Sequence, residues 1–221
     1  MWNSQVIIML LEGIRDTLYM TLASTLFGYI IGLPMGIVLT VTDKDGIRPN
    51  AAVYKVLDVI SNLLRSIPFI ILLIVLIPFT RFVVGRSYGS TATIVPLTIA
   101  AAPYIARMVE SSLKEVDAGV IEAARSMGAS DFQIVTRVML VEARTSLIVG
   151  ATISLGTILG YSAMAGTVGG GGLGDIAIRY GYYRYQVDIM IVTVIILVLL
   201  VQLFQSIGML ISRKMDKRRI D

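Results

Sequence analysis

The chain has 221 residues, of which 56% are hydrophobic and 15% are charged, and its mean hydropathy of +0.80 indicates an integral membrane protein. It contains neither Cys nor His, which excludes disulfides, thiolate nucleophiles, His-ligated metals and Ser-His-Asp triads, so we expect no catalytic or metal site. The formal charge of +4 is spread through segments between apolar runs, which fits membrane topology better than nucleic-acid binding.

The N-terminal residues 1–16 are interrupted by Glu12, Arg15 and Asp16 and lack the basic start of a cleavable signal, so we expect a short lead-in or interfacial helix. A membrane-spanning helix needs about 20 apolar residues, because lipid offers the backbone no hydrogen-bond partner. Five runs meet this requirement, at 17–42, 58–80, 87–107, 145–168 and 188–212. The last apolar run but one continues to Gly174, and we expect its end to be a re-entrant or extramembrane turn. The sequence therefore predicts one all-α membrane domain over residues 1–221 with five transmembrane helices.

The basic residues between these runs predict an orientation. One side holds Lys44, Arg48, Lys55, Arg107, Lys114, Arg125, Arg137, Arg144, Arg213, Lys214, Lys217, Arg218 and Arg219. The other side holds only Arg15, Arg81, Arg86, Arg179 and Arg184. Because cytoplasmic segments carry the excess of Lys and Arg, we expect the C-terminus and the segment 108–144 inside the cell and the N-terminus outside.

Small residues line the faces of two expected spans. They are Gly28, Gly32 and Gly36 on the first, and Gly150, Ser154, Gly156 and Gly160 on the fourth. Such faces let another helix approach closely, either within one subunit or at a subunit interface or transport path. Prolines within or beside the spans, which remove helix hydrogen bonds and favour kinks, are Pro34, Pro68, Pro78, Pro96 and Pro103.

The segment 108–144 is too long for a plain connection and lacks the composition of a linker, so we expect it to be structured. Asp117 is placed to cap a short helix, and Gly128 lies where that helix would end in a left-handed conformation. A second amphipathic helix is expected after Ser130. Its apolar side would be formed by Phe132, Val135, Val138 and Met139.

The polar stretch IEAARSMGAS within this segment carries a known pattern. Glu122, Ala123, Ala124 and then Gly128 resemble the EAA loop of permease subunits of bacterial ATP-binding-cassette importers that depend on a binding protein. The family pattern continues with Ile-x-Leu-Pro. This chain has Val138, Met139, Leu140 and Val141 there, so a valine replaces the proline that bears on how sharply the chain turns into the fourth span.

Two further stretches carry the resemblance into the spans. Arg65–Phe69, RSIPF, resembles the Arg-x-x-Pro segment of amino-acid permeases of this type. Gly160–Tyr185, with its glycine run and IRYGY, is similar to the methionine-uptake branch of the family. This resemblance implies methionine as the solute, and another amino acid or a small apolar solute is the alternative.

The resemblance also implies partners and a location. These are a second copy of the chain in a homodimer of five-helix subunits, two cytoplasmic ATPase subunits and an extracytoplasmic solute-binding lipoprotein, in the bacterial inner membrane with its lipid. The sequence contains no G-x-x-x-x-G-K-[ST] loop, so ATP and Mg would be bound by the ATPase partner. We therefore expect a transport subunit without a cofactor of its own and without enzymatic activity.

The glycines Gly169, Gly171 and Gly174 match G-x-G-x-x-G, but they follow an apolar helix instead of a strand. We expect a flexible outer turn there, not a dinucleotide site. The segment Asp175–Tyr185, with its arginines and tyrosines, is expected either to touch the binding protein or to form an aromatic belt at the membrane interface.

The resemblance assigns the segment 119–130 to a coupling helix that docks in a cleft of the ATPase and transmits its closure to the spans. The residues so implied are Gly119, Glu122, Ala123, Ala124, Arg125, Gly128 and Ala129. Glu122 would pair with Arg125 at i, i+3 or with a basic group of the partner. Candidates for the solute path are Ser154, Thr157, Tyr161, Ser162 and Met164, the last as an outer constriction.

Other function classes fit less well. A secondary transporter would carry carboxylates in the middle of its spans and show paired broken helices, and no Asp or Glu is central in any expected span. A membrane protease would have to use Ser, Lys or Asp, since His and Cys are absent. A membrane scaffold without transport activity has the same composition and stays open.

Overall fold

The computed structural model describes residues 4–215, which are all-helical as expected and contain no β-strand. The long helices are α1 (Ser4–Thr42), α5 (Ser90–Lys114), α9 (Arg144–Ala165) and α11 (Val187–Met215). The shorter ones are α2 (Ala51–Ser66), α3 (Phe69–Val75), α4 (Ile77–Val84), α6 (Ala118–Ser126), α7 (Asp131–Gln133), α8 (Leu140–Glu142) and α10 (Gly172–Ile176). A 3-10 turn, η2 (Gly166–Val168), and two π-helical segments, η1 (Ile134–Met139) and η3 (Ala177–Tyr182), complete the described chain. The start of the expected lead-in helix, residues 1–3, and the basic residues Lys217, Arg218 and Arg219 lie outside the described residues.

Within the described chain, four helices are long and apolar enough to cross a membrane, and α2 with α3 gives a fifth if this bent pair counts as one span. The expected lead-in helix is not a separate element, because α1 runs without a break from Ser4 to Thr42. Helix α5 likewise continues past the expected end at residue 107 to Lys114. Both differences have one cause: charged residues end an apolar run, but they do not end a helix.

The expected straight span 58–80 is broken, so this prediction was wrong. Helices α2 and α3 meet at 102° across Ile67 and Pro68. Proline has no N–H and disfavours the helical conformation of the residue before it, and Ile67 is extended, with φ −79° and ψ 125°. A second interruption at Leu76 precedes Pro78, which lies in the first turn of α4. The remaining prolines, Pro34, Pro96 and Pro103, lie inside the continuous helices α1 and α5.

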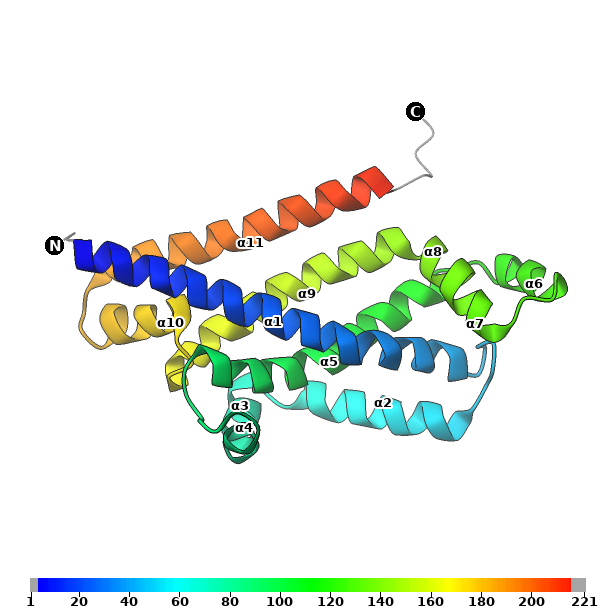
Figure 1. Ribbon diagram of the computed structural model, residues 1–221, viewed down its shortest axis with the longest axis horizontal. Coiled ribbons are helices and arrows are strands. Elements are labelled where there is room, and N and C mark those ends of the chain that lie inside the picture. The colour runs from blue at the N-terminus through cyan, green and yellow to red at the C-terminus, as the bar shows by residue number, and fades with distance from the viewer. Residues whose placement is uncertain (1–3, 216–221) are drawn as a thin grey trace.

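The core of the fold is the contact between α1 and α5, which lie side by side (Figure 1). A Cβ atom added at Gly32 would lie 2.6 Å from the carbonyl oxygen of Ala102, and one added at Gly36 would lie 2.5 Å from that of Ala106. The glycine face of the first span therefore serves packing within the subunit. The small face of α9 is different, because a Cβ at Gly160 would meet nothing within 4 Å.

The long helices place the connecting segments at two ends of the molecule (Figure 1). The linker 43–50 and the short helices α6 to α8 lie at the end where α1 and α5 finish. Helix α10 and the start of α1 lie at the opposite end. The segment 108–144 is thus structured, as expected, and forms a protruding cap at one end.

The second amphipathic helix of this cap is present but distorted. Ser130 caps α7 through a reciprocal pair of hydrogen bonds with Gln133, and the helical run continues through η1 and α8 with a π-helical register. Val135 and Met139 are buried, as expected, and Val138 is half-buried. Phe132 is 76% exposed, so its assignment to the apolar side was wrong. One residue, Ala143, separates α8 from α9 at the position after Val141 and Glu142.

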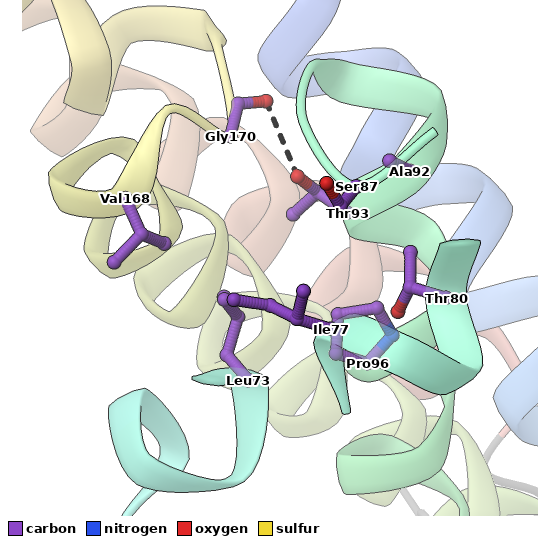
Figure 2. Close-up of a pocket in the computed structure, with 9 residues that line it drawn as sticks. All are labelled: Leu73, Ile77, Thr80, Ser87, Ala92, Thr93, Pro96, Val168 and Gly170. Atoms are coloured by element: carbon purple, nitrogen blue, oxygen red, sulfur yellow. Dashed lines mark hydrogen bonds between the residues drawn. The ribbon is translucent and has the colours of Figure 1, made fainter. Parts of the chain in front are cut away.

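The glycine-rich turn at the other end is pinned by hydrogen bonds, so the expectation of a flexible turn was wrong. The Gly89 N–H donates to the carbonyl of Gly169 (2.9 Å), and the Thr93 hydroxyl donates to the carbonyl of Gly170 (3.3 Å; Figure 2). The Thr17 hydroxyl also accepts the N–H of Leu173 (2.9 Å). The cavity in Figure 2 has a volume of only about 10 Å³, which is the scale of one water and too small for a solute.

Candidate functional site

Helix α6 is fixed at both ends by local chemistry. The Asp117 carboxylate accepts the N–H of Gly119 at 2.7 Å, as the sequence predicts for an N-cap. At the other end Gly128 has φ +83°, its N–H donates to the carbonyl of Arg125, and the N–H of Ala129 donates to that of Ala124. These two bonds form a Schellman motif, so the glycine confirms the expected left-handed helix end.

One face of α6 is anchored in the core of the subunit. Ala124 is buried, and Ile121 and Ala129 are half-buried against the same cluster. That cluster also contains Val109 and Leu113 from the end of α5. The expected coupling helix is therefore packed onto a membrane helix and cannot move independently of it without exposing apolar surface.

The other face of α6 is open. Gly119, Glu122, Ala123, Arg125 and Gly128 are all exposed. Apolar side chains lie among them, with Val120 43% exposed and Met127 82% exposed, and Phe132 follows on α7. A small, partly apolar surface at the tip of a protruding helix fits a docking element better than a solvated loop.

The expected ion pair between Glu122 and Arg125 is absent from the described residues, so this prediction was wrong. Arg125 instead donates a 2.6 Å hydrogen bond to the carbonyl of Ile47, and its guanidinium lies 3.9 Å from Asp131. A long side chain reaches the linker after α1 more readily than a neighbour on its own short helix. Arg125 therefore ties α6 to the segment 43–50, across a cavity of about 440 Å³ that Glu122 also lines.

A buried ion network lies beneath this surface, and the sequence interpretation missed it. Glu110 is 4% exposed and accepts bonds from Arg107 (2.7 Å) and Lys114 (2.8 Å) on the same helix. Arg107 also pairs with Asp58 of α2, and Lys114 pairs with Asp43 at the end of α1 (2.7 Å). The network thus joins α1, α2 and α5. The i, i+3, i+7 spacing of Arg107, Glu110 and Lys114 is the signal that pointed to it.

Asp43 carries an electrostatic signature of this network. The hydrogen bond from Lys114 lowers the pKa of the Asp43 carboxyl below its ordinary value, and the N–H of Lys44 acts in the same direction. Desolvation opposes these effects without reversing them. The carboxylate is therefore held in its charged form at the junction between α1 and the cap.

The candidate solute-path residues of α9 divide between two faces. Ser154 and Ser162 are buried, and their hydroxyls donate to the carbonyls of Gly150 (2.8 Å) and Leu159 (2.7 Å) of their own helix. Thr157 and Tyr161 are half-buried and Met164 is 46% exposed, and these three follow at helical spacing on another face. The structure thus brings together Thr157, Tyr161 and Met164 and separates them from the two serines.

The segment beyond the glycine turn presents aromatic side chains. Tyr182, Tyr183 and Tyr185 are exposed, while Arg184 lies over the ring of Tyr180 at 4.6 Å. This arrangement leaves an accessible aromatic surface at the end opposite to α6.

The exposed cap, the bundle of apolar helices and the pinned outer turn define a membrane transport component. A family model described as "Binding-protein-dependent transport system inner membrane component" matches residues 19–219, and the chain belongs to this family. The expected inner-membrane location and the expected class, a transport component, are confirmed by this membership.

Individual relatives narrow the family. The chain is 48% identical over 210 residues to the probable D-methionine transport system permease protein MetI of Vibrio cholerae, covering 95% of this chain and 93% of the relative. It is 54% identical over 158 residues to the D-methionine transport system permease protein MetI of Escherichia coli, covering 72% of this chain and 73% of the relative.

Solved structures agree with this. A chain of the MetNI methionine ABC transporter in an inward-facing conformation superposes with a TM-score of 0.96 at 49% identity, covering 98% of this chain and 100% of that one. A chain of an amino acid ABC transporter solved with histidines shares the fold, with a TM-score of 0.78 at 21% identity. The expected resemblance to the methionine-uptake branch is thereby confirmed.

Proposed function

We propose that the chain is the permease subunit of an ATP-driven importer that admits methionine delivered by a binding protein. The relatives support the solute, because those named for D-methionine transport match nearly all of this chain at about half identity. The superposition on the MetNI methionine transporter supports the architecture.

The observation that carries the proposal is the construction of α6. Its Ala124 face is locked onto the end of α5, while its tip exposes Glu122, Ala123 and Met127 beyond the helix bundle. A docked ATPase that pulls on this tip would move α5, and with it α1. The coupling residues are thus Gly119, Glu122, Ala123, Ala124, Arg125, Gly128 and Ala129.

We place α6 in the cytoplasm, with the N-terminus outside. Lys44, Arg48, Arg125 and Arg137 belong to the segments gathered at the end that carries α6, which supports this orientation by the excess of basic residues. Counting the bent pair α2 and α3 as one span gives the five spans of the proposal. The whole chain then forms a single membrane domain.

The assembled importer would contain two copies of this chain and two ATPase subunits. The open small face of α9, where Gly156 and Gly160 meet little or nothing within the subunit, suits contact with the second copy. ATP and Mg would be bound by the ATPase, and the exposed tyrosines after α10 would meet the binding lipoprotein. Between the two copies, Thr157, Tyr161 and Met164 would face the solute, with Met164 as an outer constriction, and Ser154 and Ser162 would support the helix from inside.

The test is uptake of a panel of labelled amino acids by vesicles that contain the permease, its ATPase and its binding protein. ATP-dependent uptake of methionine above the other amino acids is expected. Preference for a different amino acid would replace the solute, and absence of ATP-dependent uptake would refute the proposal.

Coupling is tested by Gly128→Val, with Gly85→Val as a matched control. Both glycines have positive φ, +83° and +78°, and open space around the missing Cβ, so the backbone strain is similar. Only Gly128 lies at the proposed joint. We expect Gly128→Val to reduce co-purification with the ATPase or uptake per ATP hydrolysed, and Gly85→Val to preserve both. Equal effects of the two variants would contradict the coupling role.

A further inference from the structure

A second, larger cavity lies where α2 breaks into α3. Its volume is about 200 Å³, and its lining includes Arg65, Ile67, Phe69, Ala100, Tyr104 and Tyr161. This is about seven times the volume of a water in the liquid, so the cavity is on the scale of one small amino acid. Because Ala100 and Tyr104 lie in the middle of α5, the cavity is at membrane depth.

Arg65 brings a charge to this cavity without a counter-charge. Among residues 4–215 its guanidinium makes no hydrogen bond or ion pair. Arg107, by contrast, is paired with Asp58 and Glu110. An unpaired cation within a membrane domain is costly and marks a site where an anionic group is received. The fork of a guanidinium matches the two oxygens of a carboxylate.

The wall opposite is aromatic and apolar. The rings of Phe69 and Tyr161 stack with centroids 4.7 Å apart and planes 4° apart, which fixes α3 against α9. Ile67 adds an aliphatic surface at the break, and Tyr104 adds a ring from α5. Aromatic edges and aliphatic carbons suit a flexible apolar side chain, and a thioether in particular makes favourable contacts with rings.

The break itself supplies an acceptor. Pro68 has no N–H, so the carbonyl of Leu64 lacks the helix donor four residues later. Leu64 also lines the cavity. Carbonyls at the end of an interrupted membrane helix are suited to bind cationic groups, as an α-ammonium requires. The cavity therefore combines one cation, one free carbonyl and an apolar wall.

We propose that this cavity is an intramembrane binding site for a free amino acid with an apolar side chain. Arg65 binds the α-carboxylate, the carbonyl of Leu64 accepts from the ammonium, and the side chain packs against Phe69 and Tyr161. The inference rests on the proposed import function and adds to it the place where the permease itself holds the solute.

The test uses the absence of Cys from the chain. Ala100→Cys, which lines the cavity, is introduced into the complete importer in vesicles, and its labelling by a membrane-permeant maleimide is measured. Methionine is expected to slow the labelling, and methioninol, which has no carboxylate, is not. Adding Arg65→Gln should raise the methionine concentration needed for protection about tenfold or more. Arg65→Lys, which keeps the charge but loses the fork, should give a smaller increase.

Val83→Cys, on the exposed surface of α4, serves as the control that methionine leaves unprotected. Uptake that persists in the Cys variant while methionine gives no protection, or equal protection with Arg65→Gln, overturns the site and leaves the import function standing. Dissociation of the two permease copies by Arg65→Gln assigns the charge to the subunit interface, and protection by anionic lipid alone assigns it to a phosphate. Both results overturn the inference. Absence of ATP-dependent amino-acid uptake by the unmodified importer refutes the import function itself.

Discussion

Replacing Gly32 by Ala tests the close contact between α1 and α5. The added Cβ would lie 2.6 Å from the carbonyl oxygen of Ala102 and 2.9 Å from the Cβ of Ile105. Neither atom is the flexible end of a side chain, so the two helices must separate. Overpacking of this kind costs about 1–3 kcal/mol, while Ala in place of Gly favours the helix by about 1 kcal/mol. With a backbone oxygen in the way, we expect a net loss of about 1–2 kcal/mol.

The assay is thermal unfolding of the purified protein in detergent. For a chain of this length a loss of about 1–2 kcal/mol lowers the melting temperature by roughly 2–8 °C. Gly150→Ala is the matched control, because Gly150 is also buried in a helix but its Cβ would meet Met108 at an ordinary 3.5 Å. It should melt at the same temperature or slightly higher. If both variants melt alike, the contact between α1 and α5 is looser than the structure indicates and the reasoning fails.

Three further predictions concern the cap, the ion network and the cavity wall. Asp117→Ala removes the N-cap of α6, which is worth about 0.5–2 kcal/mol, so hydrogen exchange of that helix should accelerate while exchange of α5 stays unchanged. The lowered pKa of Asp43 contributes stability that is present above the ordinary pKa of an aspartate, about 3.9, and is lost as the pH falls through the lower folded value. Asp43→Asn should therefore lose part of the acid sensitivity of unfolding below about pH 4; an unaltered acid profile would count against the contact with Lys114. A double-mutant cycle on Phe69 and Tyr161, with each changed to Leu, should give a coupling of about 0.5–1.5 kcal/mol in unfolding, and no coupling would mean that the stacking is incidental.

The sequence was most informative where local chemistry decides the structure. Asp117 and Gly128 were placed correctly at the two ends of α6 because a cap and a left-handed glycine depend only on their neighbours. The glycines of α1 were also expected to permit close approach, although periodicity alone did not say which helix would approach. That assignment required the third dimension.

Long-range contacts account for what the sequence did not reveal. Arg125 was paired with Glu122 on the basis of helical spacing, yet its partner is a backbone carbonyl at Ile47, and no side-chain pattern marks a carbonyl as an acceptor. Counting apolar residues likewise ran through Pro68, because hydropathy measures the length of a run and not its direction. The cavity beside Arg65 depends on that change of direction and was invisible for the same reason.

The π-helical segment η1 has a consequence for how the cap is aimed. A π turn holds more residues than an α turn, so the same length of chain accumulates a different rotation about the helix axis. Removing one residue between Ile134 and Met139 would relax the segment to ordinary α geometry and rotate everything before it by about 100° relative to α9. The direction in which the tip of α6 faces is therefore encoded in the number of residues that precede the membrane helix as much as in their identity.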